Sequence, residues 1–237
     1  MTQLSSVETG LSSRWVSAVP AAELAEPVAA LTFDDGPSEW TDSILEVLGT
    51  VGVPATFFVI GEQIAGREQT VRAAVAAGHE IGNHSLSHRH PLVGRDVEDV
   101  AADLHSANRL IEQAVGSAPV IWRPPWFQHD AAARRAAALC GLTWTVGASV
   151  HPPDYEMKSG RRIAKLVIPH VGRGTIVGLH DGCQASYEGR HSRQPTVDAV
   201  RRILKAVDGL RWVTVSELLA SVQRTGTSCR TRGRCSG

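Results

Sequence analysis

The sequence predicts an α/β fold in which helices cover a sheet of parallel strands. From Val28 onward, short apolar segments alternate with longer segments of helical period, and no two strand-like segments follow each other as a hairpin. Parallel strands need crossover connections, and about seven β-then-α units in a row supply them. A barrel and a doubly wound sheet both satisfy this pattern.

The expected strands are short and apolar, and turn residues bound them. In chain order they span residues 28–33, 55–60, 80–83, 120–122, 142–146, 175–179 and 211–214. The expected helices repeat apolar residues at steps of three and four. They span residues 41–51, 68–77, 96–115, 131–139, 163–168 and 197–207. The clearest helix has Asp96 and Gly116 at its limits, which are typical N-terminal and C-terminal capping residues.

Length and composition favour one compact domain. The chain has 237 residues, of which 43% are hydrophobic and 20% are charged, and barrels of this size are commonly single units. We expect an N-terminal extension at residues 1–27, the main α/β unit at 28–224 and a flexible C-terminal tail at 225–237.

The charge balance excludes some classes of partner. The 24 Lys plus Arg residues match 24 Asp plus Glu residues, so the formal net charge is zero. This argues against a polybasic nucleic-acid-binding protein and disfavours acidic glycans, because no strong overall field would steer them to the molecule. The sequence also has no G-x-G-x-x-G motif after the first strand and no G-x-x-x-x-G-K-[ST] motif, the usual signals for dinucleotide and P-loop nucleotide binding.

Nothing in the sequence predicts a membrane span or export. No apolar run approaches the roughly 20 residues needed to cross a bilayer, and the first 15 residues lack the basic and apolar regions of a signal peptide. We therefore expect a cytoplasmic protein. The four cysteines form no C-x-x-C pair, and we expect reduced thiols at Cys140, Cys183, Cys229 and Cys235.

Two carboxylates follow the first expected strand. Asp34 and Asp35 stand directly before a Gly-Pro turn. Neighbouring residues of an extended segment point in opposite directions, so the two carboxylates are expected to have different roles. Taken alone, the segment is better explained as a turn in which one Asp caps the following helix.

Two histidines follow the third expected strand. His84 and His88 form an H-x-x-x-H pair, whose imidazoles are expected to lie on the same side of one turn and to bind one metal ion. His79 and His90 lie nearby, so a histidine-rich loop without a metal explains the segment equally well.

Together these residues place two imidazoles and a carboxylate at the carboxyl ends of parallel strands, where barrel active sites lie. This is the ligand set of a hydrolytic zinc or similar divalent site, although such a set also holds Fe(II). The second carboxylate is then available as a general base. A further histidine would serve as general acid, and His180, at the end of an apolar strand, is the best candidate.

Four ordered segments resemble the motifs of a known family. Residues 32–37 (TFDDGP), 84–88 (HSLSH), 123–126 (RPPW) and 179–182 (LHDG) are similar to those of the polysaccharide deacetylases, the NodB-homology group of carbohydrate esterases in family 4. The resemblance covers roughly residues 28–219. It implies an irregular (β/α) barrel with parallel strands and a metal-dependent hydrolase that removes N-acetyl groups from an N-acetylated amino sugar and releases acetate.

The resemblance also implies catalytic roles. Asp34 would be the general base, Arg123 would orient its carboxylate, and His180 would protonate the leaving amine.

It further implies how metal and substrate are held. The metal ligands would be Asp35, His84 and His88, with Zn2+ as the expected ion and Co2+, Ni2+ or Mn2+ as alternatives. The backbone N–H of Trp126 would help to stabilise the oxyanion, and Leu179 would line the pocket for the acetyl methyl group.

One motif departs from the family pattern. The family usually has an Asp-Trp pair after the fifth strand, and this chain has none there. We expect Asp154 and Tyr155 to replace the pair, because the segment from them to His180 has the length seen in the family. His151 is the rival for the role of the Asp. Trp40, just after the Asp-Asp-Gly-Pro turn, is a further candidate for stacking on a sugar ring.

Three functions are compatible with these residues. The first is N-deacetylation of a chitooligosaccharide-like glycan by metal-activated water. The sequence has no G-x-S-x-G motif, which would indicate a covalent route. The second is deacylation of a small N-acyl metabolite, such as an acetylated antibiotic or glycolipid intermediate, which the expected cytoplasmic location favours. The third is a catalytically silent carbohydrate-binding barrel, which only the altered motif suggests. The sequence gives no indication of the oligomeric state.

Overall fold

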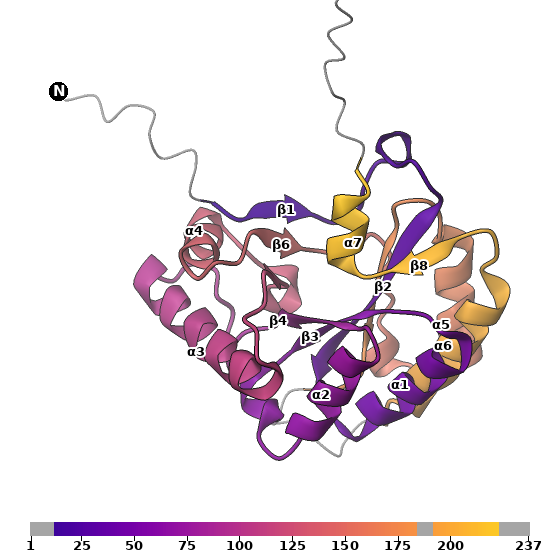
Figure 1. The fold of residues 1–237 in the computed structure, drawn as a ribbon, viewed down its shortest axis with the longest axis horizontal. Helices are drawn as coiled ribbons and strands as arrows, with labels where there is room; N and C mark the ends of the chain where they lie inside the picture. Colours follow the sequence, from indigo (N-terminus) through magenta and orange to yellow (C-terminus); the bar gives the residue numbers. More distant parts are fainter. Residues whose placement is uncertain (1–11, 184–191, 223–237) are drawn as a thin grey trace, which may run out of the picture.

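The computed structural model describes residues 12–183 and 192–222, and within them a parallel sheet forms the centre of the molecule (Figure 1). Its strands are β1 (Arg14–Val16), β2 (Val28–Gly36), β3 (Thr56–Val59), β4 (Glu80–Asn83), β5 (Ile121–Trp122), β6 (Trp144–Val146), β7 (Ile176–His180) and β8 (Arg211–Val213). The order is β1-β6-β5-β4-β3-β2-β7, with β8 also paired to β2. Every ladder in this sheet is parallel, as the crossover pattern predicts.

The sheet curls into an irregular barrel that is closed by short bridges. The chain after β6 reaches β7, where the N–H of Ser149 donates to the carbonyl of Ile176 and the N–H of Gly178 donates to the carbonyl of Val150. After β1, Ala18 forms an antiparallel bridge with Thr175. The fold is therefore the irregular (β/α) barrel that the resemblance implies.

Seven α-helices of the described residues surround the sheet (Figure 1). They are α1 (Glu39–Val51), α2 (Glu68–Ala76), α3 (Val97–Val115), α4 (Ala131–Leu139), α5 (Gly160–Val167), α6 (Gln194–Ala206) and α7 (Val215–Ala220). Capping residues limit several of them: Ser38 and Thr214 form capping boxes at the starts of α1 and α7, and Gly116 ends α3 in the left-handed conformation. Short 3₁₀ helices connect the elements at Ala21–Glu23, Gly61–Ile64, Pro125–Phe127, Asp154–Glu156 and Ile168–His170.

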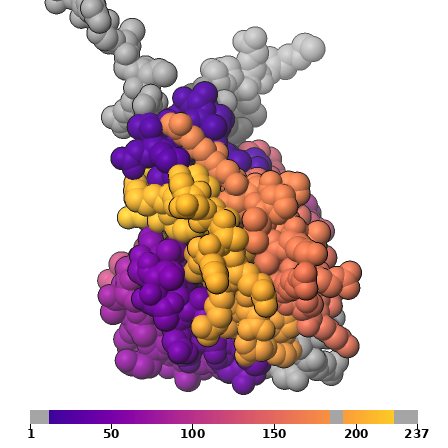
Figure 2. Space-filling model, turned by 90° about the vertical axis from the view of Figure 1, so that its right-hand side faces the viewer, coloured from indigo at the N-terminus to yellow at the C-terminus, as the bar shows by residue number. Residues whose placement is uncertain are grey.

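Alternation along β2 separates the core from the site. Phe33 and its neighbour Leu179 on β7 belong to the largest apolar cluster, which packs the sheet against the surrounding helices. Thr32 and Asp34, at the alternate positions, accept hydrogen bonds from Arg123 inside the barrel. On the outside, Figure 2 shows α6 (gold) at the surface between α1 (purple) and α5 (orange).

The structure differs from the expected strands and α-helices in three places: strand β1, the end of strand β2 and helix α7, which was not expected. Strand β1 lies within the expected N-terminal extension and was not predicted, because its three residues are too few to show a period and Arg14 and Trp15 are exposed. Strand β2 continues to Gly36, so both aspartates lie within it. The expected tail at 225–237, with Cys229 and Cys235, lies outside the described residues. In the described part, none of the helices has the length and apolar character that crossing a membrane would require.

Burial of α6 predicts which of its side chains stabilise the fold. Ile203 is fully buried in the largest apolar cluster, whereas the adjacent Arg202 is exposed. We expect Ile203→Ala to lower the free energy of unfolding by about 2–5 kcal/mol, from lost burial plus the cavity that it leaves. The control Arg202→Ala should change it by less than about 0.5 kcal/mol. Urea denaturation measures both, and equal effects would contradict this packing.

Candidate active site

Titratable side chains gather at the carboxyl ends of the parallel strands. Asp34 and Asp35 lie near the end of β2, and His180 ends β7, directly opposite Asp34 in the register of these two strands. His84 and His88 lie in the loop that follows β4. The structure thus brings together residues that are far apart in the sequence, at the edge where barrel active sites lie.

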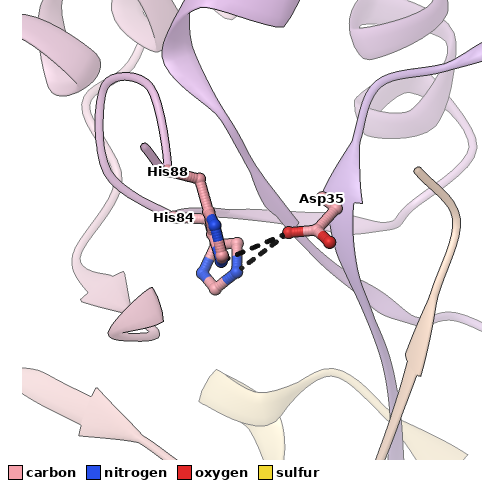
Figure 3. Close-up of side chains that lie close together, drawn as sticks. All are labelled: Asp35, His84 and His88. Atoms are coloured by element: carbon pink, nitrogen blue, oxygen red, sulfur yellow. Dashed lines mark ion pairs between the residues drawn. The ribbon is translucent and has the colours of Figure 1, made fainter. Parts of the chain in front are cut away.

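Three of these side chains form a candidate metal site. The Oδ1 atom of Asp35 is 3.4 Å from Nε2 of His84 and 3.5 Å from Nε2 of His88 (Figure 3). One ligand atom from each of the three lies within 4.8 Å of the others. This Oδ1 atom is buried and has no hydrogen-bond partner among the described residues, which is costly unless a cation binds it. The three residues therefore fit a divalent metal ion.

A strained loop, and not a helical turn, makes the two imidazoles converge. Residues 84–88 are not helical, and Ser85 (φ 70°) and His88 (φ 52°) are left-handed, as is Asp35 (φ 72°). Hydrogen bonds hold the loop: the N–H of Ser85 donates to Oδ1 of Asn83, and the N–H of His88 donates to Oγ of Ser85. The explanation of H-x-x-x-H by spacing along one turn is therefore wrong, although the pairing that it predicted is present.

A hydrogen bond to a backbone carbonyl fixes the tautomer of neutral His84. Its Nδ1 lies 2.7 Å from the backbone carbonyl of Arg123. A carbonyl only accepts, so Nδ1 carries the proton and Nε2, which faces Asp35, is left with a lone pair when the ring is neutral. This is the usual outer-shell arrangement for a metal-binding histidine.

Electrostatics favour the ionisation states that metal binding needs. Burial raises the pKa of Asp35, but the neighbouring imidazoles of His84, His180 and His88 outweigh it and hold the pKa well below its usual range. Burial, with the neighbouring His84, lowers the pKa of His88 to about 4. Near neutral pH, Asp35 is thus a carboxylate and His88 a neutral imidazole.

Asp34 is held by a buried arginine. Nη1 of Arg123 donates to Oδ1 of Asp34 and to Oγ1 of Thr32, each at 2.7 Å, while Nη2 donates to the carbonyl of Gly147 at 2.8 Å. The guanidinium is completely buried and lies 4.2 Å from the ring centre of Phe58. Arg123 occupies one carboxylate oxygen of Asp34, and no hydrogen bond within the described residues occupies the other.

His180 is paired with Asp154. Its Nδ1 lies 2.7 Å from Oδ1 of Asp154, and its backbone N–H donates to Oδ2 at 3.0 Å. Oγ1 of Thr196 also donates to Oδ2, at 2.8 Å. Asp154 is buried, whereas His151 is exposed and its ring packs beside Phe127. The structure therefore brings Asp154, and not the rival His151, to His180.

The expected substrate-binding residues have different surroundings. Trp126 is 44% exposed with its ring 4.3 Å from that of His88, and Tyr155 is 44% exposed with its ring against His180 at 5.0 Å. Trp126 is left-handed, with φ 53°, and its N–H donates to none of the described residues. By contrast, Leu179 is fully buried in the core, and Trp40 packs partly against the same core. The structure thus puts Trp126 and Tyr155 at the site and keeps Leu179 and Trp40 in packing positions.

Sequence reasoning missed Asp181, which supports the end of β2 that carries both aspartates. The N–H of Asp181 donates to the carbonyl of Asp34 at 3.1 Å, Oγ of Ser38 donates to its carbonyl, and Oγ1 of Thr41 donates to its Oδ2 at 2.6 Å. Burial, with the charges of Asp35 and Asp34, raises the pKa of Asp181 to about 7. The only sequence signal was its position directly after His180.

Comparison with known proteins agrees with this geometry. A family model described as polysaccharide deacetylase matches residues 21–145. A chitooligosaccharide deacetylase from Sinorhizobium fredii is 35% identical over 201 residues, which cover 81% of this chain and 91% of the relative. A peptidoglycan-N-acetylglucosamine deacetylase from Bacillus cereus is 34% identical over 199 residues, which cover 82% and 89% of the two chains.

Solved structures show the same fold. A family 4 acetyl xylan esterase from Clostridium thermocellum, in complex with a cobalt ion, matches with a TM-score of 0.71 and 29% identity over 81% of this chain and 90% of that chain. A family 4 pseudoenzyme from Bacillus anthracis matches with a TM-score of 0.76 and 22% identity over 88% and 70% of the two chains. The second likeness concerns the fold alone.

The packing of Gly36 against Asp181 generates a prediction. A Cβ atom at Gly36 would lie 2.2 Å from Oδ2 of Asp181 and 2.7 Å from its Cγ. We expect Gly36→Ala to lower the free energy of unfolding by about 1–3 kcal/mol through this overpacking. The matched control is Gly49→Ala in α1, where a Cβ meets nothing within 4 Å and a gain of up to about 1 kcal/mol is expected. A stable Gly36→Ala protein in chemical denaturation would contradict the contact.

The Asp154 pair sets the charge of His180. Burial lowers the pKa of His180, but Asp154, with Asp35 and Asp34, raises it to about 9 in the metal-free protein. We expect Asp154→Asn to bring this pKa to or below its ordinary value near 6.5. Histidine NMR titration of metal-free protein measures both values. Because the folded pKa is raised, the pair stabilises the fold below about pH 6.5, and this stabilisation is lost as the pH rises through about 9. An unchanged titration in the variant would refute the assignment.

Proposed function

The chain belongs to the polysaccharide deacetylase family, and on this premise we propose that it is a metal-dependent hydrolase that removes N-acetyl groups from an N-acetylated amino sugar and releases acetate. The observation that carries the proposal is the convergence at one barrel edge of a metal-ligand set, an arginine-held carboxylate and an aspartate-held imidazole. A binding protein has no need of all three together.

Asp35, His84 and His88 would hold the ion, which we propose to be Zn2+, with Co2+, Ni2+ or Mn2+ as alternatives. Two imidazoles and one carboxylate are a common ligand set of catalytic zinc. When bound, such an ion supplies Lewis-acid polarisation of the substrate carbonyl and lowers the pKa of water.

Asp34 and His180 would move protons in two different roles. Arg123 holds one oxygen of Asp34 and leaves the other to accept a proton as general base. Asp154 holds Nδ1 of His180, so the opposite ring nitrogen, Nε2, is the atom that would donate a proton to the leaving amine. The raised pKa of His180, about 9, keeps that proton in place near neutral pH until it is needed.

Trp126 and Tyr155 would orient the sugar. The unpaired N–H of Trp126 would donate to the oxyanion that forms on the acetyl carbonyl. The exposed rings of Trp126 and Tyr155 pack on His88 and His180 respectively, and so offer apolar surfaces on which a sugar ring would stack. We propose chitooligosaccharide-like oligomers as the substrate class because the matched relatives include chitooligosaccharide and peptidoglycan deacetylases.

The proposal predicts which substitution removes turnover without removing the metal. Protein stripped with a chelator and given back Zn2+ or Co2+ should release acetate from N-acetylglucosamine oligomers, as measured by mass spectrometry. We expect Asp34→Asn to lower kcat by about 10²–10⁴-fold, the range for a lost general base. Its metal content should stay at that of the parent, because Asp34 is not among the three ligand residues.

Two controls separate the alternatives. Asp42→Asn alters an exposed carboxylate of α1 and should leave turnover unchanged, whereas His88→Ala should lose metal and turnover together. If the parent protein binds metal but releases no acetate from the oligomers, the substrate class is wrong and small N-acyl metabolites are the next substrates. If the parent binds the sugar without releasing acetate and Asp34→Asn binds it equally well, the proposed chemistry is refuted.

A further inference from the structure

The zero net charge conceals a strong separation of charge along the chain. Residues 1–157 contain 9 Lys plus Arg and 19 Asp plus Glu, whereas residues 158–237 contain 15 Lys plus Arg and 5 Asp plus Glu. The first part therefore carries a formal charge of −10 and the second +10. A total of zero therefore does not describe how charge is distributed over the surface.

In the described residues, much of the positive charge lies on two neighbouring helices. Helix α5 packs closely on α6, since Gly160 lies where a Cβ atom would be 2.6 Å from Cβ of Asp198 and 2.8 Å from the backbone nitrogen of Ala199. Figure 2 faces this side of the molecule and shows the two helices side by side at the surface. Their exposed cations, with the one that precedes α5, are named the cationic strip: Lys158, Arg161, Arg162, Lys165, Arg201, Arg202 and Lys205.

The charges of the strip are not used within the fold. None of its seven side chains has a carboxylate within ion-pair distance in the part of the chain that the structure describes. Exposed arginines elsewhere do pair: Arg89 with Glu62 and Arg211 with Glu26. The single acidic residue of the two helices, Asp198, instead accepts a hydrogen bond from Gln194.

The strip also works slightly against the stability of its helices. Arg161 and Lys165 are four residues apart on α5, and so are Arg201 and Lys205 on α6. Like charges at this spacing repel and destabilise a helix by a few tenths of a kcal/mol per pair. A bound anion would remove the repulsion.

The strip begins beside the candidate active site. Helix α5 follows the turn that carries Asp154 and Tyr155, and Arg193 at the start of α6 donates to the carbonyls of Tyr155 and Gly182. From there α6 extends for 13 residues, which is about 20 Å at the rise of an α-helix. A polymer bound at the site therefore has a positively charged surface along which it can continue.

We propose that the cationic strip binds a carboxylate-bearing glycan chain, the continuation of the polymer whose N-acetylated sugar enters the active site. The proposal rests on the proposed function for the acetylated unit, and it adds that the site also accepts such a unit when it is part of a longer acidic polymer. This reverses the expectation from net charge that acidic glycans are disfavoured, because the total does not describe the local field.

The composition of the strip favours a glycan over a lipid surface. Helices that dock on membranes expose an apolar face that enters the lipid. Here the apolar side chains of the two helices are mostly buried in the core, as Ile163, Val167, Val200 and Ile203 show, and the exposed large apolar residue is Leu166. Cations without an apolar face bind polyanions by charge alone.

The test is a binding assay that does not depend on turnover. The full chain with metal restored is titrated into fluorescein-labelled polygalacturonate, a polyuronate without acetamido groups, at about 20 mM and about 200 mM NaCl, because salt screens surface charge. We compare the variant R161Q/K165Q/R201Q/R202Q with R67Q/R72Q/R95Q/R109Q, which removes the same amount of charge from α2, α3 and the residues just before them. Uncharged dextran and phosphatidylglycerol vesicles serve as further probes.

The proposal expects the parent to bind the polyuronate but not dextran, and to bind less tightly at high salt. The strip variant should bind about tenfold or more weakly at low salt and depend less on salt, because fewer counterions are released; the control variant should bind like the parent. Turnover of N-acetylglucosamine oligomers should be equal in all three proteins. Equal polyuronate binding by the two variants, or tighter binding to vesicles than to polyuronate, overturns the proposal. If the parent binds the polyuronate as expected but releases no acetate from N-acetylglucosamine oligomers, the proposed function is refuted and the proposed binding surface is not.

Discussion

The guanidinium of Arg123 is a full positive charge that lies completely inside the barrel, and the site is arranged around it. Burial of an ion is costly unless its hydrogen-bonding groups find partners, and Arg123 makes four hydrogen bonds, to Asp34, Thr32 and the carbonyls of Val146 and Gly147. Its own carbonyl meanwhile accepts from His84. One residue on the short strand-end segment after β5 thus orients both the carboxylate proposed as base and one proposed metal ligand, so the two parts of the site keep a common geometry.

The same edge of the barrel carries most of the unusual backbone. Asp35, Ser85, His88, Trp126 and Phe127 all have positive φ without being glycine, a conformation that costs free energy and needs support from its surroundings. Ser38 and Thr41 donate hydrogen bonds to Asp181, whose N–H donates to the carbonyl of Asp34 near the end of β2. Asn83 and the hydroxyl of Ser85 accept hydrogen bonds from the histidine loop. This backbone is less stable than a regular strand or helix, but it directs the side chains and the free N–H of Trp126 toward the candidate active site.

Much of this could be read from the sequence, and the failures have physical causes. Periodicity located β2 to β8 and the long helix α3, because burial imposes a pattern on elements of sufficient length. Strand β1 (Arg14–Val16) was not predicted, because pairing with β6 and not a pattern in its own sequence makes it a strand. His84 and His88 were paired for the wrong reason, because the left-handed residues that bring them together leave no signal in composition. Asp154 was located by its distance from His180, whereas Asp181 and Thr196 were missed because their partners are far away in the chain. The separation of negative and positive charge along the chain was not noticed, because the two formal charges sum to zero.

The order of the site residues along the chain has a consequence for how the protein is made. The three candidate ligands and Arg123 are all synthesised before residue 124, but Asp154 and His180 come later, and His180 reaches Asp34 only when β7 pairs with β2. Until then β2 has an open edge on that side, and an unfinished or cleaved chain that ends before β7 would have ligands for an ion but no proton donor. The pairing of β7 with β2 therefore brings the proposed proton donor beside the proposed base, so the site is complete only when the C-terminal part of the chain has joined the sheet.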